Sequence, residues 1–249
     1  MLLAIDAGNS NIKIALFDGR ELVAMSRLIT DVARTEEAYR TEIRNLFDGK
    51  DLDAIVIASV VPALNLTLQR MAETYFHVTP LFVDHISAGL KIVYDQPADL
   101  GADRIVDAVA ALAKYGAPCI VVDFGTATTF NVINETGEFI GGAISPGLMT
   151  CSEALFSRTA KLPRVEFERP ERAIATATLA AMQSGLYHGY VGLVDGVLEK
   201  LIAELGVNPR VVATGGLAPS VGPASRYIET VDDTLTLEGL RLIYERVKV

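Results

Sequence analysis

The 249-residue sequence has no tryptophan, few cysteines and histidines, and no apolar run close to the roughly 20 residues that a membrane-spanning helix needs. Its two cysteines, Cys119 and Cys151, form neither a C-x-x-C pair nor a disulfide framework, so we expect two reduced, packed side chains. The three histidines, His77, His85 and His188, share no spacing typical of metal ligands. These scarcities exclude a disulfide scaffold and a histidine-rich metal centre.

Positive charge is also scarce, with 22 basic against 31 acidic residues and a net charge of −9. Such a charge repels nucleic-acid backbones and anionic lipid surfaces, so we expect neither as a partner. Any phosphate must then be bound by local backbone N–H groups, a few cations or a metal. The first apolar stretch, residues 2–5, has no basic residue before it and ends at Asp6. It therefore does not resemble a signal peptide, and we expect a cytoplasmic protein.

Strand-like and helix-like segments alternate along nearly the whole chain, a pattern typical of α/β proteins. Asp18-Gly19 predicts a hairpin turn between two strands. The continuously apolar run 53–61 predicts a strand buried on both faces. Further along, residues 176–205 predict a long helix and residues 210–214 another strand.

Two blocks of the sequence have the same organisation. Asp6-x-Gly8 and Asp123-x-Gly125 each follow a short apolar strand and precede a hairpin, and they lie close to half a chain length apart. Such self-similarity predicts a duplicated fold with two like halves facing each other across an interdomain cleft. We place the first domain at residues 1–116 and the second at residues 117–249.

Each Asp-x-Gly loop has features that suit a phosphate. Glycine allows the backbone to approach a ligand closely, and consecutive N–H groups form a concavity that attracts anions. The carboxylate of Asp6 would repel a bare phosphate, which makes sense if Mg²⁺ lies between them, directly or through water. A single such loop is more often an ordinary turn capped by its aspartate, but two matching copies favour a polyphosphate site. Lys13 could reach a phosphate, although taken alone it better fits the solvent-facing side of an edge strand.

A predicted helix follows Gly101 and carries Asp103 and Arg104 near its start. An aspartate there commonly caps the helix. The same carboxylate could instead accept the proton of an attacking hydroxyl during phosphoryl transfer. Arg104 would offer a bidentate contact for a substrate carboxylate or for transition-state charge. The residues alone leave the capping and catalytic interpretations of Asp103 open.

The chain resembles the type III pantothenate kinases from Leu2 to about Ala218. The resemblance is carried, in order, by the segments DAGNSNIKIALFDG, YDQPADLGADRIVDAVAA, VVDFGTATTFNVI, GGAISPGL, ALFSRTAKLP, TLAAMQSGLYHGYVGLVDG and VVATGGLA. GADR and DFGTATT together are specific to that family, whereas Asp-x-Gly alone is shared across the actin, hexokinase and Hsp70-like superfamily.

The resemblance implies a fold of two ribonuclease-H-like domains. It also implies an activity, transfer of the γ-phosphoryl group of ATP to pantothenate to give 4′-phosphopantothenate, the first step of coenzyme A biosynthesis. Mg²⁺ would accompany ATP, and a monovalent cation, potassium or ammonium, would be required. The family is homodimeric, with the substrate pocket near the subunit interface.

The resemblance also implies roles for particular residues. Asp103 would be the general base, and Asp123 would bind the monovalent cation. The nucleotide would be contacted by Asp6, Ala7, Gly8, Asn9, Ser10, Asn11, Ile12, Lys13 and Thr126. Pantothenate would be contacted by Tyr94, Gly101, Ala102, Asp103, Arg104 and Thr178.

Three positions depart from the family pattern. Ser10 replaces a more usual threonine and keeps the hydroxyl. Asn131 stands where relatives commonly have aspartate, so any charge supplied there to a cation is lost. Ala175, three residues before Thr178, stands where a glycine is more usual.

Two other functions compete with this one. The first is a non-catalytic nucleotide-binding accessory protein, because some relatives were first described as transcriptional regulators. The second is a kinase of another small hydroxy acid or sugar. Arg104 favours an acidic substrate, since a neutral sugar does not need a guanidinium partner.

Overall fold

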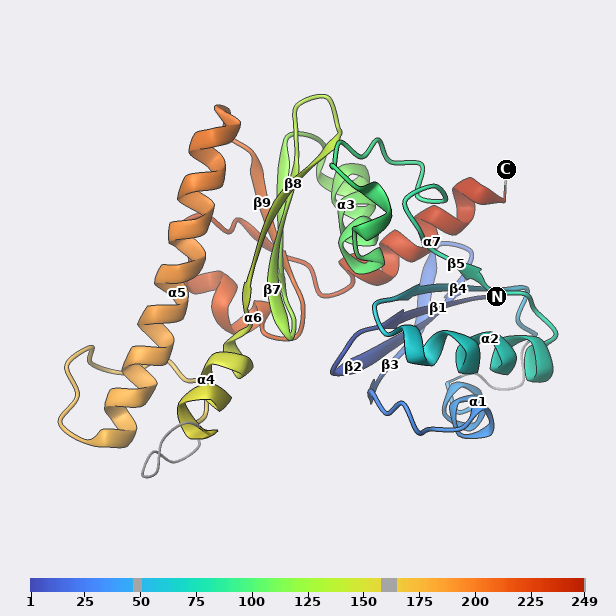
Figure 1. The fold of residues 1–249 in the computed structure, drawn as a ribbon, viewed down its shortest axis with the longest axis horizontal. Helices are drawn as coiled ribbons and strands as arrows, with labels where there is room; N and C mark the ends of the chain where they lie inside the picture. The colour runs from blue at the N-terminus through green and yellow to red at the C-terminus, as the bar shows by residue number, and fades with distance from the viewer. Residues whose placement is uncertain (47–50, 158–164, 249) are drawn as a thin grey trace. The chain divides into compact units, whose positions relative to one another are not determined.

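The computed structural model describes residues 1–46, 51–157 and 165–248. The chain forms two compact units, one made of residues 1–116 together with the chain from Thr234 onward, the other of residues 117–233. Each unit contains one five-stranded sheet (Figure 1). Within the described residues, no helix is both long enough and apolar enough to pass through a bilayer.

The sheet of the first unit has the order β3-β2-β1-β4-β5. Its strands are β1 (Leu2–Ala7), β2 (Asn11–Asp18), β3 (Glu21–Ile29), β4 (Ala54–Ser59) and β5 (Leu81–Phe82). The first three strands are antiparallel neighbours, and β1, β4 and β5 are parallel. The helices are α1 (Glu36–Arg44), α2 (Pro62–Phe76), η1 (Pro97–Asp99), α3 (Ala102–Tyr115) and α7 (Leu235–Val247).

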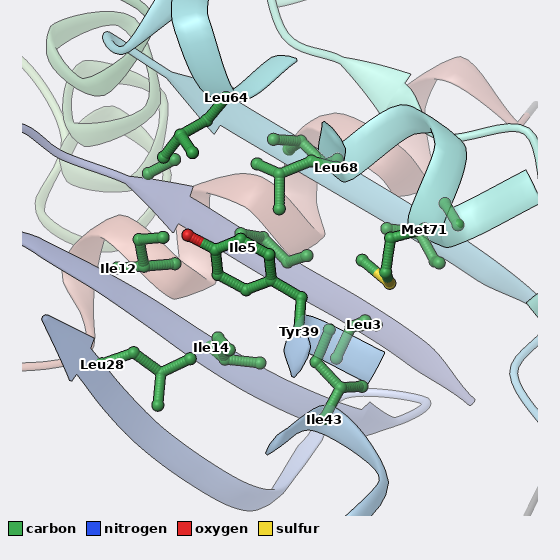
Figure 2. Packing of buried hydrophobic residues seen from close by; sticks show 14 of the residues in the cluster. Leu3, Ile5, Ile12, Ile14, Leu28, Tyr39, Ile43, Leu64, Leu68 and Met71 are labelled. Carbon is green, nitrogen blue, oxygen red and sulfur yellow. The ribbon is translucent and has the colours of Figure 1, made fainter. Parts of the chain in front are cut away.

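One face of this sheet packs against α1 and α2 around Tyr39. Thr35 caps the start of α1 by accepting a hydrogen bond from the Ala38 N–H, and Pro62 opens α2. Figure 2 shows the Tyr39 ring among side chains of β1, β2 and both helices. Full burial of a side chain of this size stabilises the unit by roughly 1.5–3 kcal/mol.

The other face of the sheet is covered by α3 and α7, which contact each other and β4, while α7 also contacts β1 and β2. The apolar stripe of α7 consists of Leu235, Leu237, Leu240 and Ile243, all fully buried. The sequence-based assignment of residues 117–249 to one domain is therefore wrong for α7. This helix needs an apolar partner to cover its stripe, and it finds one on the first sheet rather than in the half that precedes it.

The second unit repeats the plan of the first. Its elements are β6 (Cys119–Phe124), β7 (Ala127–Ile133), β8 (Phe139–Pro146), α4 (Leu148–Ser157), α5 (Thr178–Leu205), β9 (Arg210–Thr214), α6 (Ala218–Val221), η2 (Gly222–Ala224) and β10 (Thr230–Val231). The sheet order β8-β7-β6-β9-β10 matches the first sheet strand for strand, with the same sequence of antiparallel and parallel pairs. The predicted duplication is confirmed.

The apolar core of the second unit lies between one sheet face and α5. Val194 and Leu198 of α5 are fully buried against Phe124 and Phe130 of the sheet. Tyr190, from the same helix, places its hydroxyl in a short hydrogen bond with the Thr128 hydroxyl. The polar end of the buried ring is therefore satisfied.

Most predicted elements of the chain are present. The Asp18-Gly19 turn, the buried strand inside 53–61, the helix inside 176–205 and the strand at 210–214 are confirmed. Burial raises the pKa of the Cys119 thiol to about 12, as expected for a packed, reduced cysteine. Part of the ALFSRTAKLP segment, from residue 158 onward, lies outside the described residues.

Gly239 gives a test of how α7 packs. A Cβ atom at this position would lie 2.2 Å from the carbonyl oxygen of Val106 in α3. We therefore expect Gly239→Ala to lower the free energy of unfolding by about 1–3 kcal/mol, as overpacking commonly does. Urea denaturation followed by circular dichroism measures this. The control is Val247→Ala, at a half-exposed position of the same helix, with an expected change within about 0.5 kcal/mol. Equal stabilities for the two variants would contradict the packing described here.

Candidate active site

The first Asp-x-Gly loop begins where β1 ends. Asp6 on β1 lies directly opposite Lys13 on β2, and the Lys13 Nζ is 3.7 Å from Asp6 Oδ2. Both side chains are largely buried, at 16% and 11% exposure for Lys13 and Asp6. The expectation that Lys13 faces solvent on an edge strand is wrong, because β3 pairs along the whole outer side of β2. A charge this buried needs a partner, and Asp6 supplies it.

Hydrogen bonds hold the loop in a tight turn. The Gly8 N–H donates to the Asn11 carbonyl at 3.0 Å, and the Thr30 hydroxyl donates to the Gly8 carbonyl at 2.6 Å. The Thr30 N–H also donates to the Ser10 carbonyl at 3.0 Å. Asn9 and Ser10 remain exposed at the tip. Thr30 was missed by sequence reasoning, because its role depends on strand pairing and not on a local motif.

Asp103 lies in the first turn of α3 but is not its cap. The cap position is Gly101, and Asp103 is the second helical residue. Its Oδ1 accepts a hydrogen bond of 2.8 Å from the Arg104 N–H. A Cβ atom on Gly101 would lie 2.6 Å from Asp103 Oδ1, so only glycine lets the carboxylate occupy this position. The family's Gly-x-Asp spacing therefore has a local steric reason.

The α3 start and the first loop lie at the same edge of the first sheet. The Val60 N–H, just beyond β4, donates to the Ala7 carbonyl at 3.1 Å. The Val60 side chain in turn lies 3.5 Å from the position of a Cβ on Gly101. Asp6, Lys13 and α3 share one sheet face, because Asp6 and Lys13 alternate with residues of the apolar cluster under α1 and α2.

The carboxyl group of Asp103 is largely buried at the start of α3. Burial raises the pKa of its carboxyl group above the ordinary value, while the Arg104 N–H, the Arg104 charge and Lys13 oppose the rise. A raised pKa makes the carboxylate a better proton acceptor than an exposed aspartate. Arg104 itself is buried, at 7% exposure.

The second loop repeats the first in the second unit. Asp123 is near the end of β6, and the Gly125 N–H donates to the Ala127 carbonyl at 3.1 Å, as Gly8 does in the first loop. The Thr126 carbonyl accepts hydrogen bonds from the Gly147 N–H at 3.1 Å and from the Thr150 hydroxyl at 2.9 Å. Thr126 itself is exposed. The loop therefore has a rigid backbone and an accessible surface.

Gly147 braces this loop and was also missed from sequence. A Cβ atom there would lie 2.3 Å from the Thr126 carbonyl oxygen and 2.5 Å from that of Gly125. Gly147 belongs to the GGAISPGL segment, between a strand and a helix. A glycine at such a position does not indicate which distant loop its backbone contacts.

The remaining predicted residues are placed as follows. Tyr94 is 38% exposed in the segment before η1, and Ala102 is the buried first residue of α3. Thr178 is the exposed first residue of α5, in the second unit. The first unit therefore brings together Asp6, Lys13 and the start of α3. The second unit brings together Asp123 and Thr126.

Comparison with known proteins identifies the family. The model described as "Type III pantothenate kinase" matches residues 2–200, which include every site residue predicted from the sequence. The chain belongs to the type III pantothenate kinase family. A family member from Geobacter sulfurreducens is 51% identical over 252 residues, covering 99% of each chain.

Solved structures similar to this pantothenate kinase family member show the fold. A protein described as a putative Baf family transcriptional activator from Campylobacter jejuni has a TM-score of 0.62 at 19% identity, covering 99% of this chain and 98% of that one. A putative N-acetylmannosamine kinase from Listeria monocytogenes has a TM-score of 0.54 at 13% identity, covering 100% and 99%. Both comparisons support the duplicated ribonuclease-H-like fold predicted from sequence.

The raised pKa of Asp103 predicts an effect on stability. A carboxyl group whose pKa is higher in the folded protein binds its proton more tightly there than in the unfolded chain. Its ionisation at pH 7 therefore costs folding free energy, and the cost disappears as the pH falls through the raised pKa toward the ordinary value. We expect Asp103→Asn to increase the free energy of unfolding at pH 7, with an advantage that shrinks in acid.

Urea denaturation at a series of pH values measures this advantage. Asp99→Asn, in the exposed turn before α3, is the matched control and should leave the free energy of unfolding nearly unchanged. A destabilised Asp103→Asn variant at pH 7 would show that the carboxylate is a structural group.

Proposed function

We propose that this protein transfers the γ-phosphoryl group of ATP to the primary hydroxyl of pantothenate, giving 4′-phosphopantothenate for coenzyme A biosynthesis. The observation that carries the proposal is the family match over residues 2–200, together with the geometry of the GADR segment at the start of α3. That segment contributes Asp103, a buried acidic group whose raised pKa favours proton acceptance.

In this proposal Asp103 is the general base. Its Oδ1 accepts the Arg104 N–H, which fixes the carboxylate in orientation and leaves further lone pairs for the substrate hydroxyl. As the hydroxyl attacks, its proton passes to the carboxylate. Arg104 balances the charge of the pantothenate carboxylate, and Tyr94, Gly101, Ala102 and Thr178 complete the substrate contacts.

The two loops bind the nucleotide. The family resemblance assigns the phosphate contacts to residues 6–13 and to Thr126. Lys13 places a cation beside Asp6 at the end of β1, which supports phosphate binding despite the protein's net negative charge. The short donors Asn9 and Ser10 are exposed for the same purpose.

The donor set also suits the metal ions implied by the family. The Asp6 carboxylate is a hard oxygen ligand beside the first phosphate loop, and it fits a role in holding nucleotide-bound Mg²⁺ through water. Mg²⁺ held there would neutralise charge on the phosphates. Asp123, at the corresponding strand end of the second unit, fits a monovalent cation, potassium or ammonium.

We also propose that the protein is a cytoplasmic homodimer that uses neither nucleic acid nor membrane as a partner. The net charge of −9 supports the absence of nucleic-acid and membrane partners, because it repels their negative charges. Light scattering should then give a mass near twice 26.7 kDa.

The function is tested by product identification. The purified protein, mixed with ATP, Mg²⁺, potassium and pantothenate, should form 4′-phosphopantothenate and ADP, detected by mass spectrometry. Asp103→Asn should lower kcat by about 10²–10⁴-fold, the usual contribution of a general base, while the KM for ATP changes little. Asp99→Asn is the matched control and should retain full turnover.

The outcomes separate the competing functions. ADP release that does not depend on pantothenate, or nucleotide binding without turnover, would favour the accessory protein. Turnover only with another hydroxy acid or a sugar would change the substrate class. Parent-like turnover of Asp103→Asn would reject the base assignment.

Cation dependence gives a separate test of Asp123. If Asp123 binds potassium or ammonium, turnover should be higher with either ion than with sodium at equal ionic strength, and Asp123→Asn should remove the difference. Steady-state kinetics in the three chloride salts measures this. Equal rates of the parent protein in all three salts would reject the cation role.

A further inference from the structure

Three oxygen-bearing side chains form a row across the second sheet. Asp123 on β6 lies opposite Thr214 on β9 and opposite Thr129 on β7. Val122 and Phe124, which flank Asp123, belong to the apolar cluster under α5, as do Phe130 beside Thr129 and Ala213 beside Thr214. Because strand side chains alternate between the two faces, Asp123, Thr129 and Thr214 all lie on the face away from that cluster.

The Thr214 hydroxyl lacks a hydrogen-bond partner. The residue has 0% exposure, and within the described part of the chain no group accepts from or donates to its Oγ1. A buried hydroxyl that makes no hydrogen bond costs roughly 1–3 kcal/mol. Such a group at the carboxyl end of a buried strand, beside a carboxylate, points to a ligand that the hydroxyl oxygen would bind.

Gly215 holds the Asp123 carboxylate at this place. Its φ is +93°, and a Cβ atom would lie 2.3 Å from Asp123 Oδ1. The backbone that follows Thr214 therefore packs directly on the carboxylate, which only glycine permits. The same turn thus brings the end of β9 and the end of β6 together around one carboxylate.

The charge of this row suits a monovalent ion. Asp123 contributes the one carboxylate of the row, while Thr129 and Thr214 contribute neutral oxygens. Asn131, two residues beyond Thr129, is a neutral amide whose Nδ2 lies 3.3 Å from Thr129 Oγ1. Divalent cations are usually held by several carboxylates, and the described residues contain no cluster of three or more acidic, histidine or cysteine ligands. Potassium is bound mainly by neutral oxygens.

We infer that the Thr214 hydroxyl is a ligand of the monovalent cation held by Asp123, so that the end of β9 supplies part of the cation site. This inference rests on the cation requirement in the proposed function. Thr129 lies on the other side of the carboxylate and contributes a second hydroxyl oxygen. Since the Thr214 oxygen is fixed by a buried strand, it also sets the size of ion that the site accepts.

The test measures cation binding through thermal unfolding. The full chain with Mg²⁺ and ADP is heated in tetramethylammonium chloride and in potassium chloride at equal ionic strength. Potassium should raise the unfolding temperature of the parent protein, because a ligand that binds only the folded state stabilises it. Thr214→Val keeps the shape and removes the hydroxyl, so its half-saturating potassium concentration should rise by about tenfold or more, as for loss of other metal-supporting groups. Thr214→Ser should behave like the parent.

Two controls make the result specific. Ser145 on β8 is another buried hydroxyl without a hydrogen bond among the described residues, but it lies opposite Thr128 and so on the other sheet face. Ser145→Ala should keep the full potassium response. In tetramethylammonium chloride, Thr214→Val should unfold at the parent temperature or above, because the orphaned hydroxyl is gone. If Thr214→Val does not fold, Thr214→Ala gives the same comparison.

A parent-like potassium response in Thr214→Val would overturn the inference, and so would the absence of any potassium response in the parent protein. Product formation separates this failure from that of the proposed function. A protein that makes 4′-phosphopantothenate without a Thr214-dependent potassium response would refute the inference alone. A Thr214-dependent response without product would refute the proposed function alone.

Discussion

The central strand of each sheet is buried on both faces, and this constraint determines where polar chemistry can occur. Along β1 every side chain is buried, and the one charged group, Asp6, lies near the end of the strand beside Lys13. A carboxylate in the middle of such a strand would have no partner, since its neighbours on both sides are apolar. The equivalent strand β6 places Asp123 in the same way. Strand ends are thus the positions where the fold can hold charge.

Both units place a carboxylate at the end of their central strand, but the surroundings of the two carboxylates differ. In both units a glycine N–H closes the turn by donating to a carbonyl two or three residues ahead. In the first unit the carboxylate beside that turn is balanced by a lysine. In the second unit, Thr129 and Thr214 lie opposite Asp123 on the neighbouring strands, and the backbone of Gly215 packs on its carboxylate. One backbone plan therefore supports two electrostatic environments, which suits sites for ions of different kinds.

Much of this fold can be predicted from sequence because strand, turn and repeat signals are local. The Asp18-Gly19 hairpin, the long helix α5 and the paired Asp-x-Gly loops are all local patterns. The solvent exposure of Lys13 was predicted wrongly, because exposure depends on whether a neighbouring strand covers that side. The neighbouring strand β3 is longer than its apolar residues suggest. The partner of α7 could not be predicted, since an amphipathic helix shows that it needs a surface but not which one.

Some site residues could be predicted from sequence motifs, and others could be found only in the structure. Motif resemblance located Asp103, and the structure adds the reason for the preceding glycine, which no pattern of residue types expresses. Thr30, Gly147 and Thr214 carry no motif. They are recognised only from contacts with carbonyl groups distant in sequence or, for Thr214, from a hydroxyl that makes no hydrogen bond within the described part of the chain.

The return of α7 to the first unit affects the order in which the chain can acquire its structure during synthesis. The apolar face that α7 covers belongs to strands made at the beginning of translation, whereas residues 235–247 leave the ribosome after the whole second unit. The second unit is continuous in sequence and can complete its core first. The half that is started first is therefore finished last, and one face of its sheet stays uncovered until α7 emerges.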